Sequence, residues 1–97
     1  MNNSAPRIVA DDSVPRLPRG VRLIDSPAQG GMVLLAPERV FKPDAIALEI
    51  LKRCKGTASV SAIADELAAT YNAPRERVLD DVKLLLGSLA DKQLLEL

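Results

Sequence analysis

The sequence lacks most of the residues on which catalytic and metal sites depend. Its 97 residues include no histidine, no tryptophan and one cysteine, Cys54. Histidine is the commonest general base near neutral pH and a frequent metal ligand, and a lone cysteine can form neither an internal disulfide nor a cysteine-based zinc site. Cys54 also falls on the apolar stripe of an expected helix, which favours a buried, inert thiol. We therefore expect neither a bound metal nor a cofactor.

Aromatic residues and long hydrophobic runs are also scarce. Aromatics make up 2% of the chain, as Phe41 and Tyr71, against 47% apolar residues in all, so we expect a core of Leu, Ile, Val and Ala. No run reaches the roughly 18 apolar residues of a membrane helix, and the N-terminal residues contain no apolar stretch of signal-peptide length. The sequence thus predicts a cytoplasmic protein without a membrane partner.

Neither sign of charge dominates the chain. Thirteen basic residues face thirteen acidic ones, so no overall field attracts nucleic acid or an anionic membrane. Residues 1–43 carry six basic and four acidic side chains, a net charge of +2, and residues 44–97 carry seven and nine, a net charge of −2. The half in which the helices are expected is therefore the acidic one.

The first part of the chain predicts a tail followed by a small sheet. Residues 1–15 mix Asn, Ser, Ala, Asp and Pro with Ile8-Val9 as the one apolar pair, so we assign them to a flexible N-terminal tail and residues 16–97 to one domain. Strands are expected at residues 21–25, 32–36 and 39–42, separated by turns at residues 26–31 and at Pro37-Glu38. The apolar run 32–36 suits a central strand, and Pro43 ends the third strand, which we expect at the edge.

The remainder of the chain predicts three helices. Asp44 is a suitable N-cap for a first helix that runs toward Lys55 and ends at Gly56 as its C′ residue. A second helix is expected after Ser59 or Ser61, and Pro74 suits the first position of a long third helix. Residues 91–97 fit either a last helical turn or an extended tail. The fold class is α+β and winged helix-turn-helix-like, with three short antiparallel strands followed by three helices.

A winged helix is most often a DNA-binding fold, so a DNA-binding regulator is the alternative function. In such proteins the third helix enters the major groove, and its cations neutralise phosphates. Here the charges of that helix cancel: Arg75, Arg77, Lys83 and Lys92 against Glu76, Asp80, Asp81 and Asp91. The sequence therefore argues against nucleic acid as a partner.

Enzymatic chemistry has few candidate residues. The adjacent carboxylates Asp65-Glu66 and Asp80-Asp81 are the obvious acid/base pairs, but neighbouring residues on a helix point about 100° apart and do not converge on one site. Gly30-Gly31 lacks the spacing of a phosphate-binding loop. We expect a protein without catalytic residues.

Peptide binding fits the pattern better. It requires a strand edge with free backbone groups and, beside it, an apolar groove. The expected edge is Arg39, Val40, Phe41 and Lys42. An apolar stripe on the third helix, wider than one core contact requires, offers the groove wall, consisting of Val78, Leu79, Val82, Leu85 and Leu86.

Three segments resemble the PqqD family of pyrroloquinoline quinone biosynthesis proteins. They are Leu17-Pro18-Arg19-Gly20-Val21-Arg22-Leu23, Val33-Leu34-Leu35-Ala36-Pro37-Glu38-Arg39 and Ile50-Leu51-Lys52-Arg53-Cys54-Lys55-Gly56. The resemblance extends from about residue 15 to the end of the chain. It implies a peptide chaperone, the family's recognition element for ribosomally made precursor peptides, which binds the precursor PqqA and delivers it to the radical S-adenosylmethionine enzyme PqqE.

The resemblance also implies where the precursor lies. In the family the peptide adds as a strand beside the third strand and against the third helix, which here corresponds to Arg39–Lys42 and to the segment from Arg75 to Leu86. The chain departs from the family at Met32, where a bulkier residue is frequent, and at Lys55, where an acidic residue is frequent. Relatives use the same element for other modified peptides, so the binding mode is implied more directly than the identity of the precursor.

Overall fold

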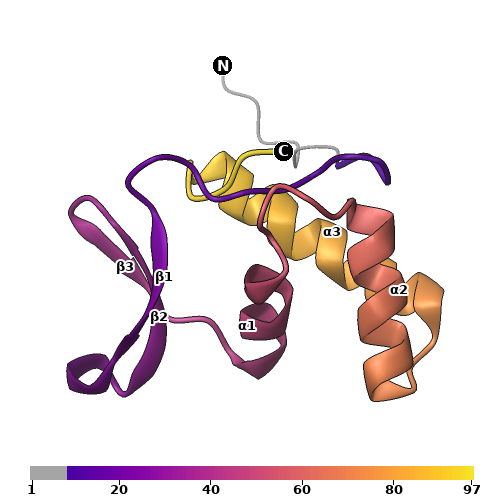
Figure 1. The fold of residues 1–97 in the computed structure, drawn as a ribbon, viewed down its shortest axis with the longest axis horizontal. Helices are drawn as coiled ribbons and strands as arrows, with labels where there is room; N and C mark the ends of the chain where they lie inside the picture. Colours follow the sequence, from indigo (N-terminus) through magenta and orange to yellow (C-terminus); the bar gives the residue numbers. More distant parts are fainter. Residues whose placement is uncertain (1–8) are drawn as a thin grey trace.

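The computed structural model describes residues 9–97, which form an antiparallel sheet followed by three α-helices (Figure 1). The elements are β1 (Arg22–Ser26), a 3₁₀ turn η1 (Pro27–Gln29), β2 (Gly31–Ala36), β3 (Arg39–Phe41), α1 (Ala45–Lys52), α2 (Val60–Tyr71) and α3 (Arg75–Asp91). This order confirms the predicted α+β arrangement of strands followed by helices.

The sheet has the order β1-β2-β3, with both neighbouring pairs antiparallel. The apolar strand β2 is therefore central and β3 lies at an edge, as predicted. Pro37 and Glu38 form the two-residue turn between β2 and β3, with Glu38 at φ +62°. The third strand ends at Phe41, one residue earlier than expected, so Lys42 lies beyond the ladder.

The two faces of the sheet differ in what covers them. Leu34 and Ala36 belong to the main core, and Leu23 and Phe41 pack against it, so these side chains face the helices. Successive residues of a strand point to opposite faces. We call the face turned away from the helices the outer face, and its apolar residues are Ile24, Val33, Leu35 and Val40.

Local signals in the sequence define where the helices begin. The Asp44 carboxylate accepts a hydrogen bond of 2.8 Å from the Ala47 amide at the start of α1. Ser59, rather than Ser61, caps α2 and accepts a bond of 3.0 Å from the Ala62 amide. Pro74 is the N-cap of α3 and not its first residue.

The end of α1 differs from the prediction. The helix ends at Lys52, so Gly56 is not its C′ residue. Gly56 does adopt φ +78°, but in the following loop, where its amide donates to the Pro15 carbonyl at 3.0 Å. Lys55 forms a β-bridge with Arg16. Pairing with this distant segment replaces the last helical turn.

Part of the segment assigned to a flexible tail contacts the domain. Val9 is 6% exposed, and the Val60 and Ser61 amides at the start of α2 donate to the Ser13 and Asp11 carbonyls at 2.8 and 2.9 Å. These bonds satisfy amides that a helix N-terminus leaves without intrahelical partners. The contacts thus begin before residue 16, the expected domain boundary. Residues 1–8, the rest of the expected tail, lie outside the described residues.

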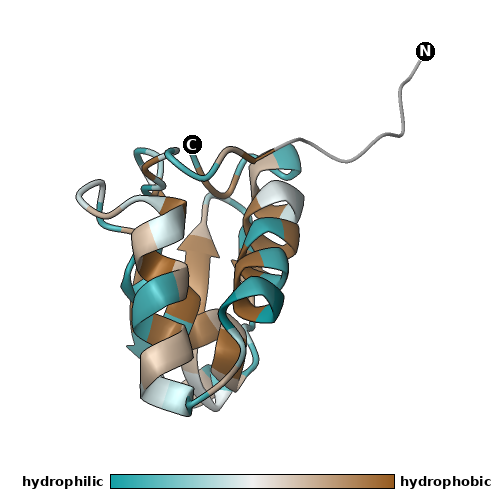
Figure 2. Ribbon diagram, turned by 90° about the vertical axis from the view of Figure 1, so that its right-hand side faces the viewer, coloured by the Kyte–Doolittle hydropathy of each residue, from teal (hydrophilic) through white to brown (hydrophobic). Residues whose placement is uncertain are grey.

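The core is aliphatic, as the composition predicts. Its fully buried side chains are mostly Leu, Ile and Val from β2 and all three helices. Figure 2 shows hydrophobic segments on the strand seen between the helices and on the helices around it. After α3 the chain turns at Lys92 and Gln93 and then runs as a short tail: Leu94 and Leu95 are buried, and Glu96 forms a bridge with Arg16. This settles the question left open for residues 91–97 in favour of a tail after Asp91.

Candidate functional site

The backbone of β3 has an open side. In a hairpin with a two-residue loop, the two residues that flank the loop exchange backbone hydrogen bonds; here they are Ala36 and Arg39. Along the rest of the ladder, hydrogen-bonded pairs then alternate with pairs that are not hydrogen-bonded. Phe41 is therefore bonded to Leu34, whereas the N–H and C=O of Val40 point away from β2. No other described strand pairs with β3. The Val40 backbone groups are thus available to an added strand.

The side chains around this edge are largely accessible. Val40 is 45% exposed, and Arg39 and Lys42 are also exposed. Phe41 is half-buried and packs against the core. The four residues predicted at this edge therefore lie together, with two cations flanking an apolar pair.

The residues predicted on α3 divide into two groups. Val78, Leu79 and Leu85 are half-buried and pack against the core, while Val82 and Leu86 are each 0% exposed. Leu86 is part of the core and has no surface with which to contact a peptide. The expectation that the whole stripe faces the groove is therefore wrong for Leu86, which belongs to a core cluster that also contains residues of β2, α1 and α2.

Arg75, the first residue of α3, points toward α2. Its guanidinium forms an ion pair with Asp65 and donates to the Ser61 hydroxyl at 2.6 Å. The Asp65 carboxylate raises the pKa of Arg75. Lys83 is likewise paired with Asp11, which lowers the pKa of that carboxyl. Two of the cations on which DNA binding by α3 depends are thus neutralised within the molecule.

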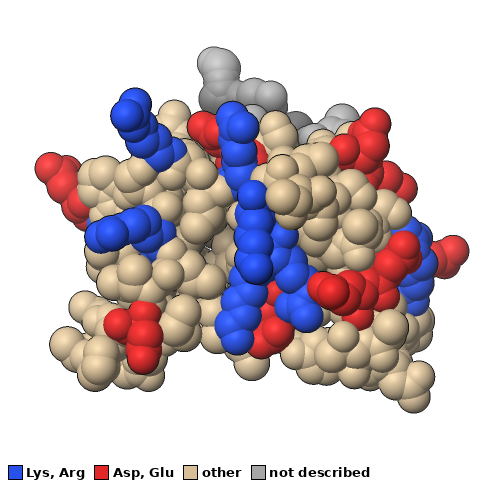
Figure 3. Space-filling model, in the orientation of Figure 1, with Lys and Arg blue, Asp and Glu red and all other residues tan. Residues whose placement is uncertain are grey.

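The charges on the surface are mixed. Figure 3 shows Lys and Arg side chains in a column over the middle of one face, with Asp and Glu around them. No large region of this face carries a single sign. This face therefore adds nothing in favour of a nucleic acid partner.

A largely apolar groove with a volume of about 200 Å³ lies between the three helices. Val78 and Val82 form its α3 side, Ile46 and Ile50 its α1 side, and Leu67 and Tyr71 its α2 side; Ala73, Pro74, Glu49, Arg77 and Asp81 complete the lining. Ile46 and Tyr71 are 53% and 50% exposed. None of the β3-edge residues is part of this groove, so α1 is the wall opposite α3.

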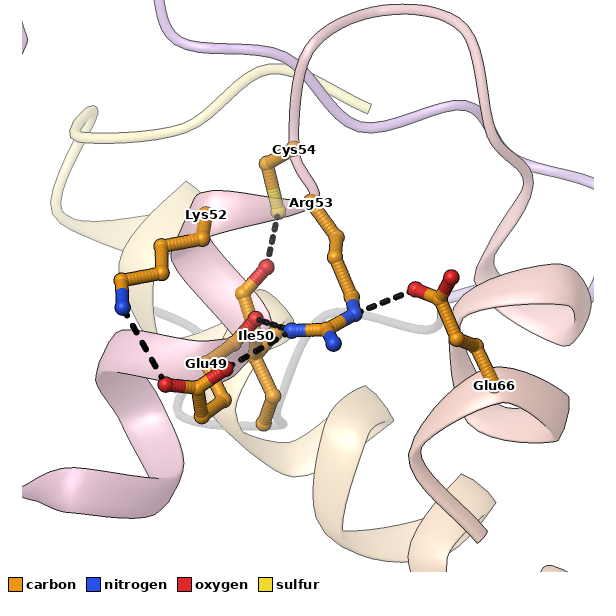
Figure 4. A network of polar contacts seen from close by, with 6 residues as sticks. All are labelled: Glu49, Ile50, Lys52, Arg53, Cys54 and Glu66. Carbon is orange, nitrogen blue, oxygen red and sulfur yellow. Dashed lines mark hydrogen bonds and ion pairs between the residues drawn. The ribbon is translucent and has the colours of Figure 1, made fainter. Parts of the chain in front are cut away.

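A polar network attaches α1 to α2 beside this groove (Figure 4). Arg53 donates to the Glu49 carbonyl at 2.7 Å and to its carboxylate at 3.0 Å, and also pairs with Glu66 on α2. Lys52 contacts the same Glu49 carboxylate at 3.2 Å. Hydrogen bonds from Arg53 and Lys52 lower the pKa of Glu49. The network satisfies a carbonyl at the end of α1 and fixes the position of that groove wall.

The remaining candidates for chemistry do not assemble into a site. Burial raises the pKa of the Cys54 thiol to about 12, and its Sγ lies 3.3 Å from the Ile50 carbonyl. Within residues 9–97, no three His, Cys, Asp or Glu side chains are grouped so as to hold a metal ion. None of the described helices has the length and hydropathy needed to cross a membrane.

Ile46 and Tyr71, the exposed apolar residues of the groove, are not among the predicted site residues. Ile46 lies in the first turn of α1, outside the apolar stripe formed by Ala47, Ile50, Leu51 and Cys54. This position in the sequence already indicates that its side chain does not face the core. Tyr71 is the last residue of α2, where the chain turns at Asn72 and leaves the side chain half exposed.

Comparison with known proteins gives a consistent result. The family model described as "Coenzyme PQQ synthesis protein D (PqqD)" matches residues 31–95. A PqqA binding protein of Bradyrhizobium diazoefficiens is 49% identical over 84 residues, which cover 87% of this chain and 82% of that protein. A bifunctional coenzyme PQQ synthesis protein C/D of Methylorubrum extorquens is 43% identical over 91 residues, 94% of this chain but 24% of that protein.

Solved structures agree with the sequence matches. The solution NMR structure of the PqqD truncation of Methylobacterium extorquens PqqCD, described as a functional and stand-alone RiPP recognition element, superposes with a TM-score of 0.78. It is 43% identical and covers 92% of this chain and 95% of that one. The crystal structure of PqqD from Xanthomonas campestris has a TM-score of 0.60 at 44% identity, covering 92% and 99% of the two chains.

Proposed function

The chain belongs to the PqqD family, and on this premise we propose that it is a peptide chaperone in pyrroloquinoline quinone biosynthesis. In this proposal it binds the precursor peptide PqqA as an added strand on β3 and presents it to the radical S-adenosylmethionine enzyme PqqE in the cytoplasm. In this proposal residues 16–97 form the recognition domain, and the segment from Val9 to Pro15 packs against it. The radical chemistry belongs to PqqE, and this chain contributes binding alone. The relatives named PqqA binding protein support the choice of ligand.

The observation that carries the binding mode is the open side of β3. Val40 directs its N–H and C=O away from β2, and no described strand of the chain occupies that side. A disordered peptide satisfies these groups by pairing with them, as in other cases of β-strand addition. Beyond the end of β3, the apolar groove at Ile46 and Val78 offers an anchor for peptide side chains.

The energies of these contacts suffice for a complex. Each added strand hydrogen bond contributes about 0.5–1.5 kcal/mol net. Each apolar anchor that becomes fully buried contributes about 1.5–3 kcal/mol. Three such bonds and two anchors together exceed an association cost of at least about 4 kcal/mol. At the upper ends of these ranges about 6.5 kcal/mol remains after the association cost, which corresponds to a dissociation constant of roughly 20 µM. We therefore expect saturable binding at tens of micromolar.

The test is a titration of labelled PqqA against the wild-type protein and the variant Val40→Pro. Proline removes the outward N–H and places its ring where the incoming strand pairs, but leaves the β2–β3 bonds of Arg39 and Phe41 in place. We expect the variant to keep the wild-type circular dichroism spectrum and to bind PqqA at least about 10-fold more weakly, the equivalent of one lost strand hydrogen bond and the steric cost of the ring.

A matched control is available on the opposite edge of the sheet. Asp25 pairs with Met32, and by the same alternation its N–H points away from β2. Asp25→Pro therefore removes an outward donor from β1 and is expected to leave PqqA binding unchanged. Equal affinities of a folded Val40→Pro variant and the wild type would exclude strand addition at β3.

A further inference from the structure

The outer face of the sheet is apolar and only partly covered. None of its four apolar residues belongs to the main core cluster or packs against it. Val33, in the central strand, is nevertheless 2% exposed, and its partner Ile24 and its strand neighbour Leu35 are half-buried. These three side chains are therefore more covered than Val40 is.

Val40 is the most exposed of the four outer-face residues. It pairs with Leu35 on one side, has no strand on the other, and is 45% exposed. The row Arg22, Leu35, Val40 runs across all three strands and ends at the open edge. A fourth strand would supply the missing neighbour of Val40.

We propose that the peptide bound at β3 is recognised on both faces of the sheet. The peptide residue opposite Val40 carries an apolar side chain, β-branched or aromatic, that packs on Val40 on the outer face. The adjacent peptide residue turns an apolar side chain toward Phe41 on the helix side. This inference rests on the proposed strand addition and specifies the class of peptide that it accepts.

The register leads to this specificity. Any strand that pairs with β3 places alternate side chains on the two faces, because the period of a strand is two residues. The residue opposite Val40 extends the row of Leu35, and its neighbour extends the row of Leu34 and Phe41. Cross-strand pairs of apolar side chains stabilise both rows. The preferred ligand therefore contains consecutive apolar residues and not an alternating apolar and polar pattern.

A second copy of this chain is a less suitable occupant than a peptide. Arg39 and Lys42 flank the open edge, and neither forms an ion pair with a described residue. Two β3 strands paired edge to edge would bring four cations into one short ladder, where like charges repel. A peptide without basic residues at those positions avoids this repulsion.

The test separates the side chain of Val40 from its backbone. Val40→Thr keeps the N–H and the β-branched shape but replaces one methyl group by a hydroxyl, so strand pairing remains possible. We expect it to weaken binding of labelled PqqA by about 4-fold, the equivalent of one buried methyl group. Val14→Thr is the matched control, since Val14 is 39% exposed and lies outside the sheet, and it is expected to bind as the wild type does.

A direct structural readout accompanies the affinities. In a methyl-labelled complex, the Val40 methyl groups are expected to show intermolecular NOEs to an apolar PqqA side chain. Wild-type affinity of Val40→Thr combined with weak binding by Val40→Pro would refute the outer-face contact and leave strand addition intact. Wild-type affinity of both variants would refute strand addition itself. Light scattering that shows a dimer for the wild type and a monomer for Val40→Pro would assign the edge to a second copy and overturn the inference.

Discussion

Truncation of Leu86 tests whether this residue serves the core and not the ligand. Its side chain is 0% exposed in the interface that α3 forms with α2 and the sheet. Leu86→Ala removes three carbon atoms, worth about 0.8 kcal/mol each in transfer free energy alone. The cavity left behind adds to this, and buried Leu→Ala changes cost about 2.7–5.0 kcal/mol in a well-studied series. We therefore expect the free energy of unfolding to fall by about 3–5 kcal/mol.

Leu84 is the matched control on the same helix. It is 68% exposed, so Leu84→Ala makes the same change in composition and helix propensity without creating a cavity, and is expected to shift stability by at most about 0.5 kcal/mol. Urea unfolding followed by circular dichroism at 222 nm measures both. For a domain of this size each kcal/mol corresponds to a fall in Tm of about 4–8 °C, so Leu86→Ala is expected to melt at least about 12 °C below the wild type.

The total stability of such a domain is about 5–15 kcal/mol, so the loss expected for Leu86→Ala is a large part of it. A second, less destabilising variant is therefore used to measure binding. Leu86→Met conserves volume and is expected to cost less than about 1.5 kcal/mol. Its folded form should bind PqqA as tightly as the wild type does. A cost below about 1 kcal/mol for Leu86→Ala, or loss of PqqA binding in a stable Leu86→Met variant, would refute the assignment of Leu86 to the core.

Two further predictions concern Cys54 and Asp44. The pKa of Cys54 is raised from 9.0 to about 12 in the folded state, so between these pH values the unfolded chain loses this proton while the folded chain keeps it. The free energy of unfolding then falls with rising pH by up to about 1.4 kcal/mol per unit. The stability difference between the wild type and Cys54→Ala should therefore change with pH over this range. A difference independent of pH would contradict the raised pKa of Cys54. Asp44→Ala removes the N-cap of α1 and should lower the free energy of unfolding by about 1 kcal/mol, whereas Asp44→Asn keeps a hydrogen-bond acceptor and should cost less. Equal losses of unfolding free energy for the two variants, measured by urea unfolding, would argue against a capping role.

Local signals in the sequence predicted most of the fold. Asp44 and Ser59 begin their helices as N-caps, and Pro37-Glu38 reverses the chain as a two-residue turn. The unbroken apolar run of β2 indicated a central strand with neighbours on both edges. These features depend on nearby residues, which is why they are readable without a structure.

The errors arose where distant segments meet. Gly56 has the positive φ typical of a C′ glycine, yet α1 ends earlier because Lys55 and Gly56 contact the segment at Pro15 and Arg16. Val9 is buried although it lies in a segment whose Asn, Ser, Asp and Pro residues indicate a tail. Local composition and periodicity carry no information on such pairings.

The candidate site was predictable in part. The open edge at Val40 follows from the turn, the strand order and Pro43, all of which the sequence indicates. The division of the α3 stripe into Leu86 in the core and Val78 in the groove depends on how α1 and α2 pack around it. Ile46 completes that groove from α1, so its role emerges only when the helices are assembled.

Amide hydrogen exchange at Val40 tests the central claim most directly. In the free protein its N–H points away from β2 and is expected to exchange rapidly, whereas the Arg39 and Phe41 amides are protected by their bonds to β2. Saturating PqqA should slow exchange at Val40 and leave Asp25, on the opposite edge, unchanged. Unaltered exchange at Val40 in the saturated complex would contradict strand addition on β3.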